Sequence, residues 1–184
     1  MKYLLLFILA FSSPAMAKPD CSVHKLYCAI VKLNPHLDKD FAMRLSDLFY
    51  KHSKKYNVDP YRSIAIAMQE NTFQNRSVEL VDIHIRRETT CTFDGECNTA
   101  EKQTVARTND IGLFQINERT AIAEKLDLHL LQTDLDYSTE QHFKLLVKKM
   151  KVCDHLGKEA WTCYHSATPK YRLRYKKKVN KHYK

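Results

Sequence analysis

The sequence has few of the residues that divide a chain into separate units. Only three of its 184 residues are glycine and only five are proline. No internal repeat, low-complexity segment or Pro/Gly-rich linker interrupts residues 18–184. A stretch of that length is typical of one domain, which buries on the order of two-thirds of the surface of its unfolded chain. We therefore predict a single domain over residues 18–184.

Long apolar runs are also absent beyond the N-terminus. There, Lys2 precedes an apolar run at residues 4–11, and the small-residue site Ala-Met-Ala follows at residues 15–17. The run is well below the roughly 20 residues that a bilayer-spanning helix needs. This order of charge, apolar run and small residues is typical of a cleavable signal peptide. We expect residues 1–17 to be removed on export, which predicts a periplasmic or secreted protein. A retained signal anchor is the alternative.

The sequence lacks a closely spaced Cys-x-x-Cys pair and a Cys/His cluster, which argues against zinc. All six cysteines follow the expected cleavage site, and an even number in an exported chain indicates disulfides. Six cysteines allow fifteen pairings, and the spacing favours neighbours. The expected pairs are Cys21 with Cys28, Cys91 with Cys97, and Cys153 with Cys163. Residues 93–95, Phe-Asp-Gly, predict a three-residue hairpin loop that places the middle pair opposite each other.

Acidic residues are absent from residues 170–184, which carry eight Lys and Arg residues interleaved with tyrosines. The formal net charge of +9 becomes +8 without Lys2, because residues 1–17 hold no other charge. In an exported protein this basic tail predicts contact with anionic envelope polymers or lipid headgroups rather than nucleic acid. Two alternatives are a solvated basic helix face and a terminal helix that closes the fold, with Leu173 and Val179 turned inward.

Apolar residues at helical spacing predict that most of the domain is α-helical. Residues 40–56 and 136–153 each place apolar side chains along one side of a helix. Gly157 is the expected stop after the second of these helices. Shorter helices are predicted over residues 158–165 and 169–182.

Capping residues mark two of the expected helix starts. Asp59 and Pro60 suit the N-cap and the first position of a helix that continues through residues 61–70. Glu70 then lies near the C-terminal end of that helix. Thr168 is the expected cap of the last helix.

Residues 78–110 have a different pattern. Polar and apolar residues alternate at positions 81–85, threonines are frequent, and an Asp-Gly turn follows. This pattern predicts a small β-hairpin inserted between helices, which either walls a substrate cleft or decorates the surface. The predicted fold class is α+β, predominantly α.

Three separated segments carry a family resemblance: residues 65–73 (AIAMQENTF), 112–117 (GLFQIN) and 160–166 (AWTCYHS). Their order and character resemble the soluble lytic transglycosylase (SLT) domain family, which is related to goose-type lysozyme. The resemblance covers about residues 60–175. It implies a lysozyme-like fold and a peptidoglycan lytic transglycosylase that needs neither a metal nor an organic cofactor.

The resemblance assigns Glu70 as the catalytic acid, and the residue's setting agrees with that role. Cleavage of a glycosidic bond requires a carboxylic acid that stays protonated near neutral pH, so that it can protonate the leaving oxygen. The negative end of a helix and an apolar cleft both raise the pKa of a carboxyl group. Without the other motifs, Glu70 would be interpreted as an ordinary solvated glutamate.

The resemblance also implies a set of substrate-binding residues: Asn71, Phe114, Gln115, Asn117, Tyr164 and His165. Three of them depart from the family pattern, because Asn71 replaces serine, Phe114 replaces methionine and His165 replaces asparagine. Tyr164 matches the family tyrosine whose hydroxyl lies near the acid. His165 either hydrogen-bonds the sugar, which we favour, or adds a proton-transfer group.

The implied reaction cleaves the bond between N-acetylmuramic acid and N-acetylglucosamine in glycan strands and leaves a 1,6-anhydro product. We expect a monomer. The closest alternative is a hydrolase of the same fold, in which a second carboxylate activates water roughly 6.5–9.5 Å from the acid. Candidates for that carboxylate are Asp82, Glu88 and Asp110. A non-catalytic envelope-binding or secretion-assembly module is the third hypothesis, which the changes at positions 71 and 165 permit.

Overall fold

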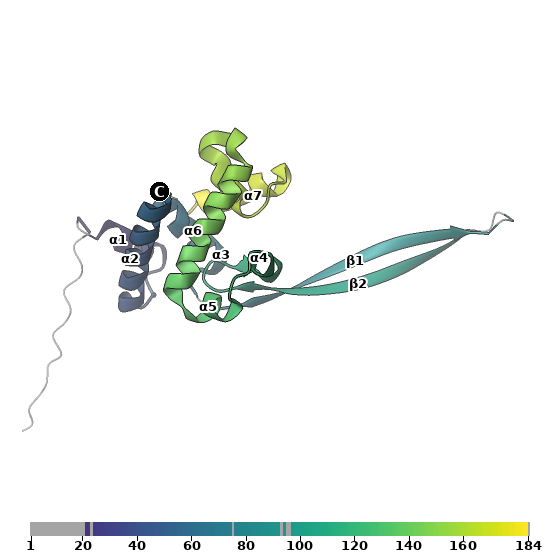
Figure 1. Cartoon of the computed structure of the whole chain (residues 1–184), viewed down its shortest axis with the longest axis horizontal. Helices are drawn as coiled ribbons and strands as arrows, with labels where there is room; N and C mark the ends of the chain where they lie inside the picture. Colours follow the sequence, from purple (N-terminus) through teal and green to yellow (C-terminus); the bar gives the residue numbers. More distant parts are fainter. Residues whose placement is uncertain (1–20, 23, 75, 93, 95–96, 184) are drawn as a thin grey trace, which may run out of the picture.

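The computed structural model describes residues 21–183 except 23, 75, 93, 95 and 96. The expected signal peptide lies outside the described residues. The described part is mostly helical with one antiparallel sheet, which confirms the predicted α+β class (Figure 1). Its helices are α1 (Lys25–Leu33), α2 (Lys39–Tyr56), α3 (Pro60–Asn71), α4 (Glu118–Ala123), α5 (Leu128–Thr133), α6 (Leu135–Val152), the 3₁₀ helix η1 (Asp154–Tyr164) and α7 (Pro169–Asn180).

The helix α2 begins one residue before its predicted start. Asp38 caps it, because the Asp38 carboxylate accepts a hydrogen bond from the Phe41 amide at 2.8 Å. Phe49, on its buried side, meets the rings of Phe114 and Phe143 edge-on, with centroid distances of 5.9 and 6.2 Å. The predicted apolar side of this helix therefore forms part of the core.

The helix α3 confirms the predicted cap at Asp59, whose carboxylate accepts a hydrogen bond from the Tyr61 amide. Five consecutive residues, 63–67, are buried, so the middle of this helix is covered by protein on all sides. The helix ends at Asn71, and Thr72 follows in the left-handed conformation with φ 50°. A buried helix thus carries Glu70 on its last turn.

The helix α6 ends earlier than predicted. It stops at Val152, and the chain continues as η1 instead of reaching a stop at Gly157. Gly157 lies inside η1 with φ 54°, where it kinks the segment. The disulfide Cys153–Cys163 joins the two ends of this excursion. The helix predicted over residues 158–165 is therefore the second half of a 3₁₀ segment.

The inserted hairpin is confirmed by strands β1 (Val78–Cys91) and β2 (Cys97–Ile111), which pair from Val78↔Asp110 to Cys91↔Cys97. At about 3.3 Å per residue its strands are roughly 45 Å long, and the hairpin projects from the helical body (Figure 1). At its base, β2 pairs with the short strand β3 (Ile116–Asn117). The loop predicted at residues 93–95 lies outside the described residues except for Asp94.

The three predicted disulfides are present. Cys21 is bonded to Cys28 beside α1, and Cys91 is bonded to Cys97 at the far end of the hairpin. Together with Cys153–Cys163 they leave no cysteine of the chain unpaired. Each bond closes a short local segment, so none of them joins distant parts of the fold.

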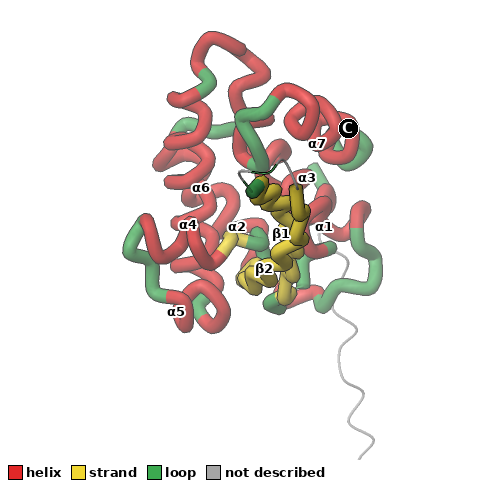
Figure 2. The backbone as a smooth tube through the Cα atoms, turned by 90° about the vertical axis from the view of Figure 1, so that its right-hand side faces the viewer, coloured by secondary structure: helices red, strands yellow, loops and turns green. Residues whose placement is uncertain are grey.

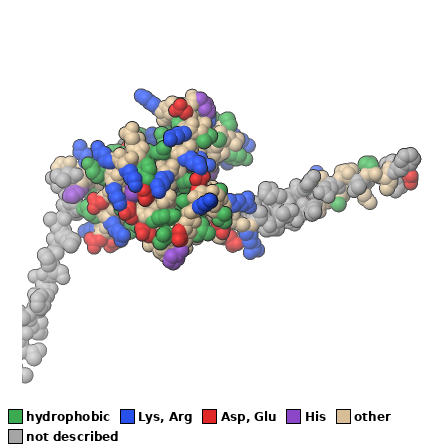
Figure 3. Space-filling model, in the orientation of Figure 1, with side chains coloured by type: hydrophobic (Ala, Val, Ile, Leu, Met, Phe, Trp, Pro, Cys, Tyr) green, Lys and Arg blue, Asp and Glu red, His purple; other side chains and the backbone are tan. Residues whose placement is uncertain are grey.

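The basic tail forms α7, which closes the fold with Val179 turned inward as predicted and with Tyr175 in the place expected for Leu173. Val179 and Tyr175 are buried against α3 and η1, whereas Leu173 is 51% exposed and does not turn inward. Thr168 stands at the N-cap position, but its side chain makes no capping hydrogen bond. Lys and Arg side chains also occur across the visible face of the helical body, so the positive charge is not confined to α7 (Figure 3).

None of the described helices is both long enough and apolar enough to cross a membrane.

The buried side of α7 predicts a stability difference between two substitutions. We expect Val179→Ala to lower the free energy of unfolding by about 2 kcal/mol, because it removes methyl groups from a fully buried site. Leu173→Ala, on the exposed side of the same helix, should change it by less than about 0.5 kcal/mol. Urea denaturation measures both, and equal effects would mean that α7 does not close the core.

Candidate active site

A cavity of about 330 Å³ lies where the end of α3, the β2–β3 turn, α4, α6 and the end of η1 come together. Figure 2 looks onto the side from which the hairpin projects, with these helices around its base. Five of the predicted site residues line this cavity: Glu70, Gln115, Asn117, Tyr164 and His165. The other lining residues are Asp110, Ile116, Thr120, Leu145 and Lys149. The three motifs thus converge on one site.

Glu70 is the most strongly perturbed carboxyl group of the cavity. Burial raises its pKa from 4.5 to about 7, and the nearby negative charge of Asp110 acts in the same direction. A hydrogen bond from Tyr175 and the positive charge of Lys178 partly oppose this rise. At neutral pH a large fraction of Glu70 is therefore protonated, as a general acid requires.

Tyr175 holds the Glu70 carboxyl group in place. Its hydroxyl donates a hydrogen bond to Glu70 Oε1 at 2.5 Å. The Tyr175 ring is buried, and the His165 ring stacks on it with a centroid distance of 4.8 Å. Sequence reasoning missed this residue. A signal for it existed, because Tyr175 and Val179 are four residues apart and so lie on one side of α7.

Tyr164 contributes to the cavity in a different way. Its hydroxyl donates a hydrogen bond to the Phe114 carbonyl at 3.3 Å rather than to Glu70. Burial raises its pKa well above 10, and the charges of Glu70 and Asp110 add to that effect. The direct hydroxyl contact to Glu70 is thus made by Tyr175, and Tyr164 forms part of the wall.

The Phe114 side chain does not reach the cavity, in contrast to the expectation from its motif. It is completely buried, and its ring lies parallel to the His142 ring at a centroid distance of 4.0 Å. His142 is itself fully buried, which lowers its pKa to about 3. The stacked rings of Phe114 and neutral His142 therefore form a buried support for residues 112–117.

Asn71 is also buried and acts as a structural link. Its amide nitrogen donates hydrogen bonds to the carbonyls of Gln74, Arg76 and Gly112, and its amide oxygen accepts one from Arg76 Nε at 3.0 Å. These bonds tie the end of α3 to the β2–β3 turn. Asn71 thus fixes the backbone beside Glu70 instead of contacting the cavity.

The β2–β3 turn presents two amide side chains to the cavity. Gly112 and Gln115 adopt positive φ angles of 72° and 48°, which bend the chain sharply. Gln115 Nε2 donates to the carbonyls of Gly112 and Arg76. Asn117 caps α4 through its side-chain oxygen, while its nitrogen donates to Asp110 Oδ1 at 2.9 Å.

The comparison with protein families agrees with this geometry. Residues 47–166 match the Transglycosylase SLT domain. The chain belongs to this family. No curated protein and no solved structure gives a significant match. Membership in the SLT family indicates a transglycosylase-type enzyme that acts on peptidoglycan. The match includes every residue that lines the cavity, while Tyr175 lies beyond its end.

Asp110, one of the three alternative carboxylates, lines the cavity from β2. Burial raises its pKa, and its hydrogen bond from Asn117 and the charge of His165 oppose that rise. Residues 82 and 88 lie four and ten positions along β1 from its first residue, which corresponds to roughly 13 and 33 Å out along the hairpin.

Two cations adjoin the cavity around Glu70, which we call the Glu70 cavity. Lys149 lines it from α6, and the charge of Lys178 on α7 acts on both Glu70 and His165. Among the described residues, no carboxylate forms an ion pair with either ammonium group. Both charges are thus free to meet an anionic substrate. No group of three or more described His, Cys, Asp or Glu side chains is placed to hold a metal ion.

The raised pKa of Glu70 predicts a pH-dependent effect of Glu70→Gln on stability. The folded state disfavours ionised Glu70, so the wild-type chain loses stability as the pH rises from about 4.5 through about 7. The neutral glutamine avoids this loss, and we expect the variant to gain about 2–3 kcal/mol relative to wild type at pH 8. At pH 4 the two should be nearly equal. Thermal denaturation at both pH values tests this, and a gain that does not depend on pH would contradict it.

Proposed function

We propose that this chain is a lytic transglycosylase that cleaves the β-1,4 bond between N-acetylmuramic acid and N-acetylglucosamine, with Glu70 as the only acid and base. The observation that carries the proposal is the Glu70 carboxyl group, which has a pKa of about 7 and a fixed position under the Tyr175 hydroxyl. A carboxyl group with such a pKa can both give and take a proton near neutral pH.

In the first step, Glu70 donates its proton to the glycosidic oxygen. The bond from that oxygen to the anomeric carbon of the muramic residue breaks, and its electron pair stays with the leaving oxygen. Positive charge develops at the anomeric carbon. The Glu70 carboxylate formed in this step retains its hydrogen bond from Tyr175, which stabilises the anion.

In the second step, the Glu70 carboxylate takes the proton of the muramic C6 hydroxyl. The oxygen of that hydroxyl then bonds to the anomeric carbon and closes the 1,6-anhydro ring. Glu70 returns to its protonated form, so the cycle consumes neither water nor a cofactor. The neighbouring charge of Asp110 favours the return of the proton, because it disfavours a second anion.

The cations beside the cavity support a wall glycan over a neutral polysaccharide. Muramic residues carry a lactyl group with either a free carboxylate or a peptide stem that itself bears carboxylates. Lys149 and Lys178 place two positive charges near the bound strand. These charges would favour the acidic strand through attraction at short range.

Hydrolysis is the second candidate reaction, and the position of Asp110 in the cavity favours it. An inverting hydrolase needs a carboxylate that holds a water molecule on the opposite face of the sugar. Asp110 Oδ1 already accepts a hydrogen bond from Asn117, and burial raises the Asp110 pKa. The raised pKa strengthens Asp110 as a base, but the Asn117 hydrogen bond opposes that rise and already engages one of the two oxygens that could hold the water, so we prefer the single-acid scheme.

A binding module without catalysis is the remaining hypothesis. Burial of an ionisable group is costly, and a module that only binds glycan has no use for a carboxyl group with a pKa raised to about 7. Perturbed groups of this kind concentrate at catalytic sites. We also propose that the enzyme acts after export, in the periplasm or outside the cell, because three disulfides suit an oxidising compartment.

Product analysis tests the proposal. Digestion of purified sacculi followed by mass spectrometry should yield 1,6-anhydromuramic ends, and Glu70→Gln should lower the rate at least about 1,000-fold, because it removes the group that protonates the leaving oxygen. Asp110→Asn should keep the anhydro product. Reducing muramic ends from the wild-type chain, lost in Asp110→Asn, would instead establish the hydrolase.

The pH dependence of the reaction tests the role of Tyr175. The acid must be protonated, so kcat/KM should fall about tenfold per pH unit above pH 7. Tyr175→Phe removes the donor that lowers the Glu70 pKa, so this alkaline limb should move to higher pH. Tyr171→Phe, on the exposed side of α7, is the matched control and should leave the limb unchanged. A shift to lower pH in Tyr175→Phe would contradict the assignment.

A further inference from the structure

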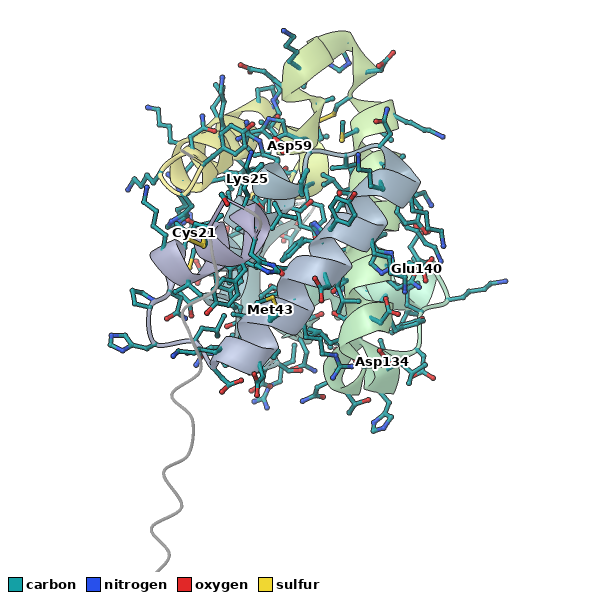
Figure 4. The ribbon with its side chains drawn as sticks, turned by 90° about the vertical axis from the view of Figure 1, so that its left-hand side faces the viewer. Cys21, Lys25, Met43, Asp59, Asp134 and Glu140 are labelled. Carbon is teal, nitrogen blue, oxygen red and sulfur yellow. A yellow bond between two sulfur atoms is a disulfide. The ribbon has the colours of Figure 1, made fainter. Side chains whose placement is uncertain are left out.

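A second cavity lies apart from the Glu70 cavity and has about 630 Å³ of space. Its walls are formed by Ser22 and His24, by residues 25–27 of α1, by residues 46–54 of α2 and by the turn at residues 57–61. We call this cavity the α1–α3 groove. It shares no lining residue with the Glu70 cavity. Pro60 and Glu70 stand at opposite ends of α3, roughly 15 Å apart. Figure 4 looks onto this side, where the labelled Lys25 and Asp59 lie close together.

Two tyrosine rings are exposed in the α1–α3 groove. Tyr50 is 59% exposed and Tyr61 is 38% exposed, while Tyr27 beside them is almost fully buried. Aromatic side chains in a concave site offer flat apolar faces, and their hydroxyl groups remain in contact with water. A ligand that suits them has flat apolar faces of its own and polar edges.

The polar groups of the groove include both hydrogen-bond donors and acceptors. Asp47 offers a carboxylate and Lys25 an ammonium group, and neither side chain forms a hydrogen bond or an ion pair with another described residue. The Lys54 ammonium lies over the Tyr50 ring, 5.7 Å from its centroid. Free groups of both signs beside exposed rings suit a saccharide, whose hydroxyls donate and accept and whose ring faces stack on aromatic rings.

Fixed local structure preforms the groove. The disulfide Cys21–Cys28 ties Cys21 to α1. On the opposite wall, Asn57 ends α2 in the left-handed conformation and Asp59 caps α3, which fixes the turn between the two helices. A preformed site loses little conformational freedom on binding.

We propose that the α1–α3 groove is a second saccharide-binding site, which holds a wall glycan strand while the Glu70 cavity acts on the same polymer. The inference rests on the proposed function only for the identity of the glycan. Two sites on one chain raise the affinity for a long polymer, because the second contact forms at a high effective concentration. Short fragments, which occupy one site at a time, gain nothing from the groove.

Binding to sacculi tests the groove separately from catalysis. In a Glu70→Gln background, which removes cleavage, we expect Tyr50→Ala with Tyr61→Ala to weaken binding to intact sacculi about tenfold. Tyr171→Ala removes an aromatic ring that is 51% exposed outside the groove, and it should leave binding unchanged. Co-sedimentation with purified sacculi gives the affinity. Two controls separate loss of the rings from misfolding. Thermal denaturation should show that the double variant is folded, and Tyr50→Trp, which keeps an aromatic ring, should retain binding.

In the active chain, the same double substitution should slow the clearing of sacculi and leave kcat/KM on a muramyl tetrasaccharide within about twofold of wild type. Unchanged sacculus affinity of the double variant would overturn the proposal. Competition of that binding by free stem peptide but not by chitotetraose would also overturn it, in favour of a peptide ligand. If the groove binds glycan but the wild-type protein releases no cleaved product, the result contradicts the proposed activity and still supports the proposed binding site.

Discussion

The burial of one carboxyl group governs the arrangement of this protein. Glu70 lies on the last turn of α3, a helix whose middle is fully covered, so the proposed acid is carried by a buried element of the core. Burial alone would leave a carboxyl group without a defined orientation. The Tyr175 hydroxyl supplies that orientation at 2.5 Å. Burial thus raises the pKa of this carboxyl group, and one hydrogen bond keeps it in place.

The orientation of Glu70 depends on the C-terminal helix α7, which packs against α3. Tyr175 reaches Glu70 because Val179 and its neighbours pack α7 against α3 and η1. The basic helix α7 therefore has a structural role. The positive charge of Lys178 on that helix also lowers the pKa of Glu70. The disulfide at the ends of η1 fixes the segment that presents Tyr164 and His165 from the other side. Elements that lie about a hundred residues apart in the sequence thus enclose the Glu70 carboxyl group.

Local signals predicted α2, α3 and α6 and the position of Glu70 late in α3, because the information was local. The Asp59-Pro60 start and the apolar spacing of α2 and α6 needed no knowledge of the partners. The six-residue helices α4 and α5 escaped prediction because two turns are too short for a clear periodicity. The burial of Phe114 and Asn71, and the contact of Tyr175 with Glu70, depend on distant residues that only the fold brings together. The spacing along α7 did carry a signal for the inward side chain, because Tyr175 is four residues from Val179 and Leu173 is six.

The long hairpin changes how the molecule moves as a particle. A ribbon of roughly 45 Å that stands away from a small helical body adds little mass but much friction. The protein will therefore diffuse more slowly, and leave a sieving column earlier, than a sphere of 184 residues. Elution volume alone would therefore overestimate the mass of a single chain. Sedimentation equilibrium, which depends on mass and not on shape, is the appropriate measure of its oligomeric state.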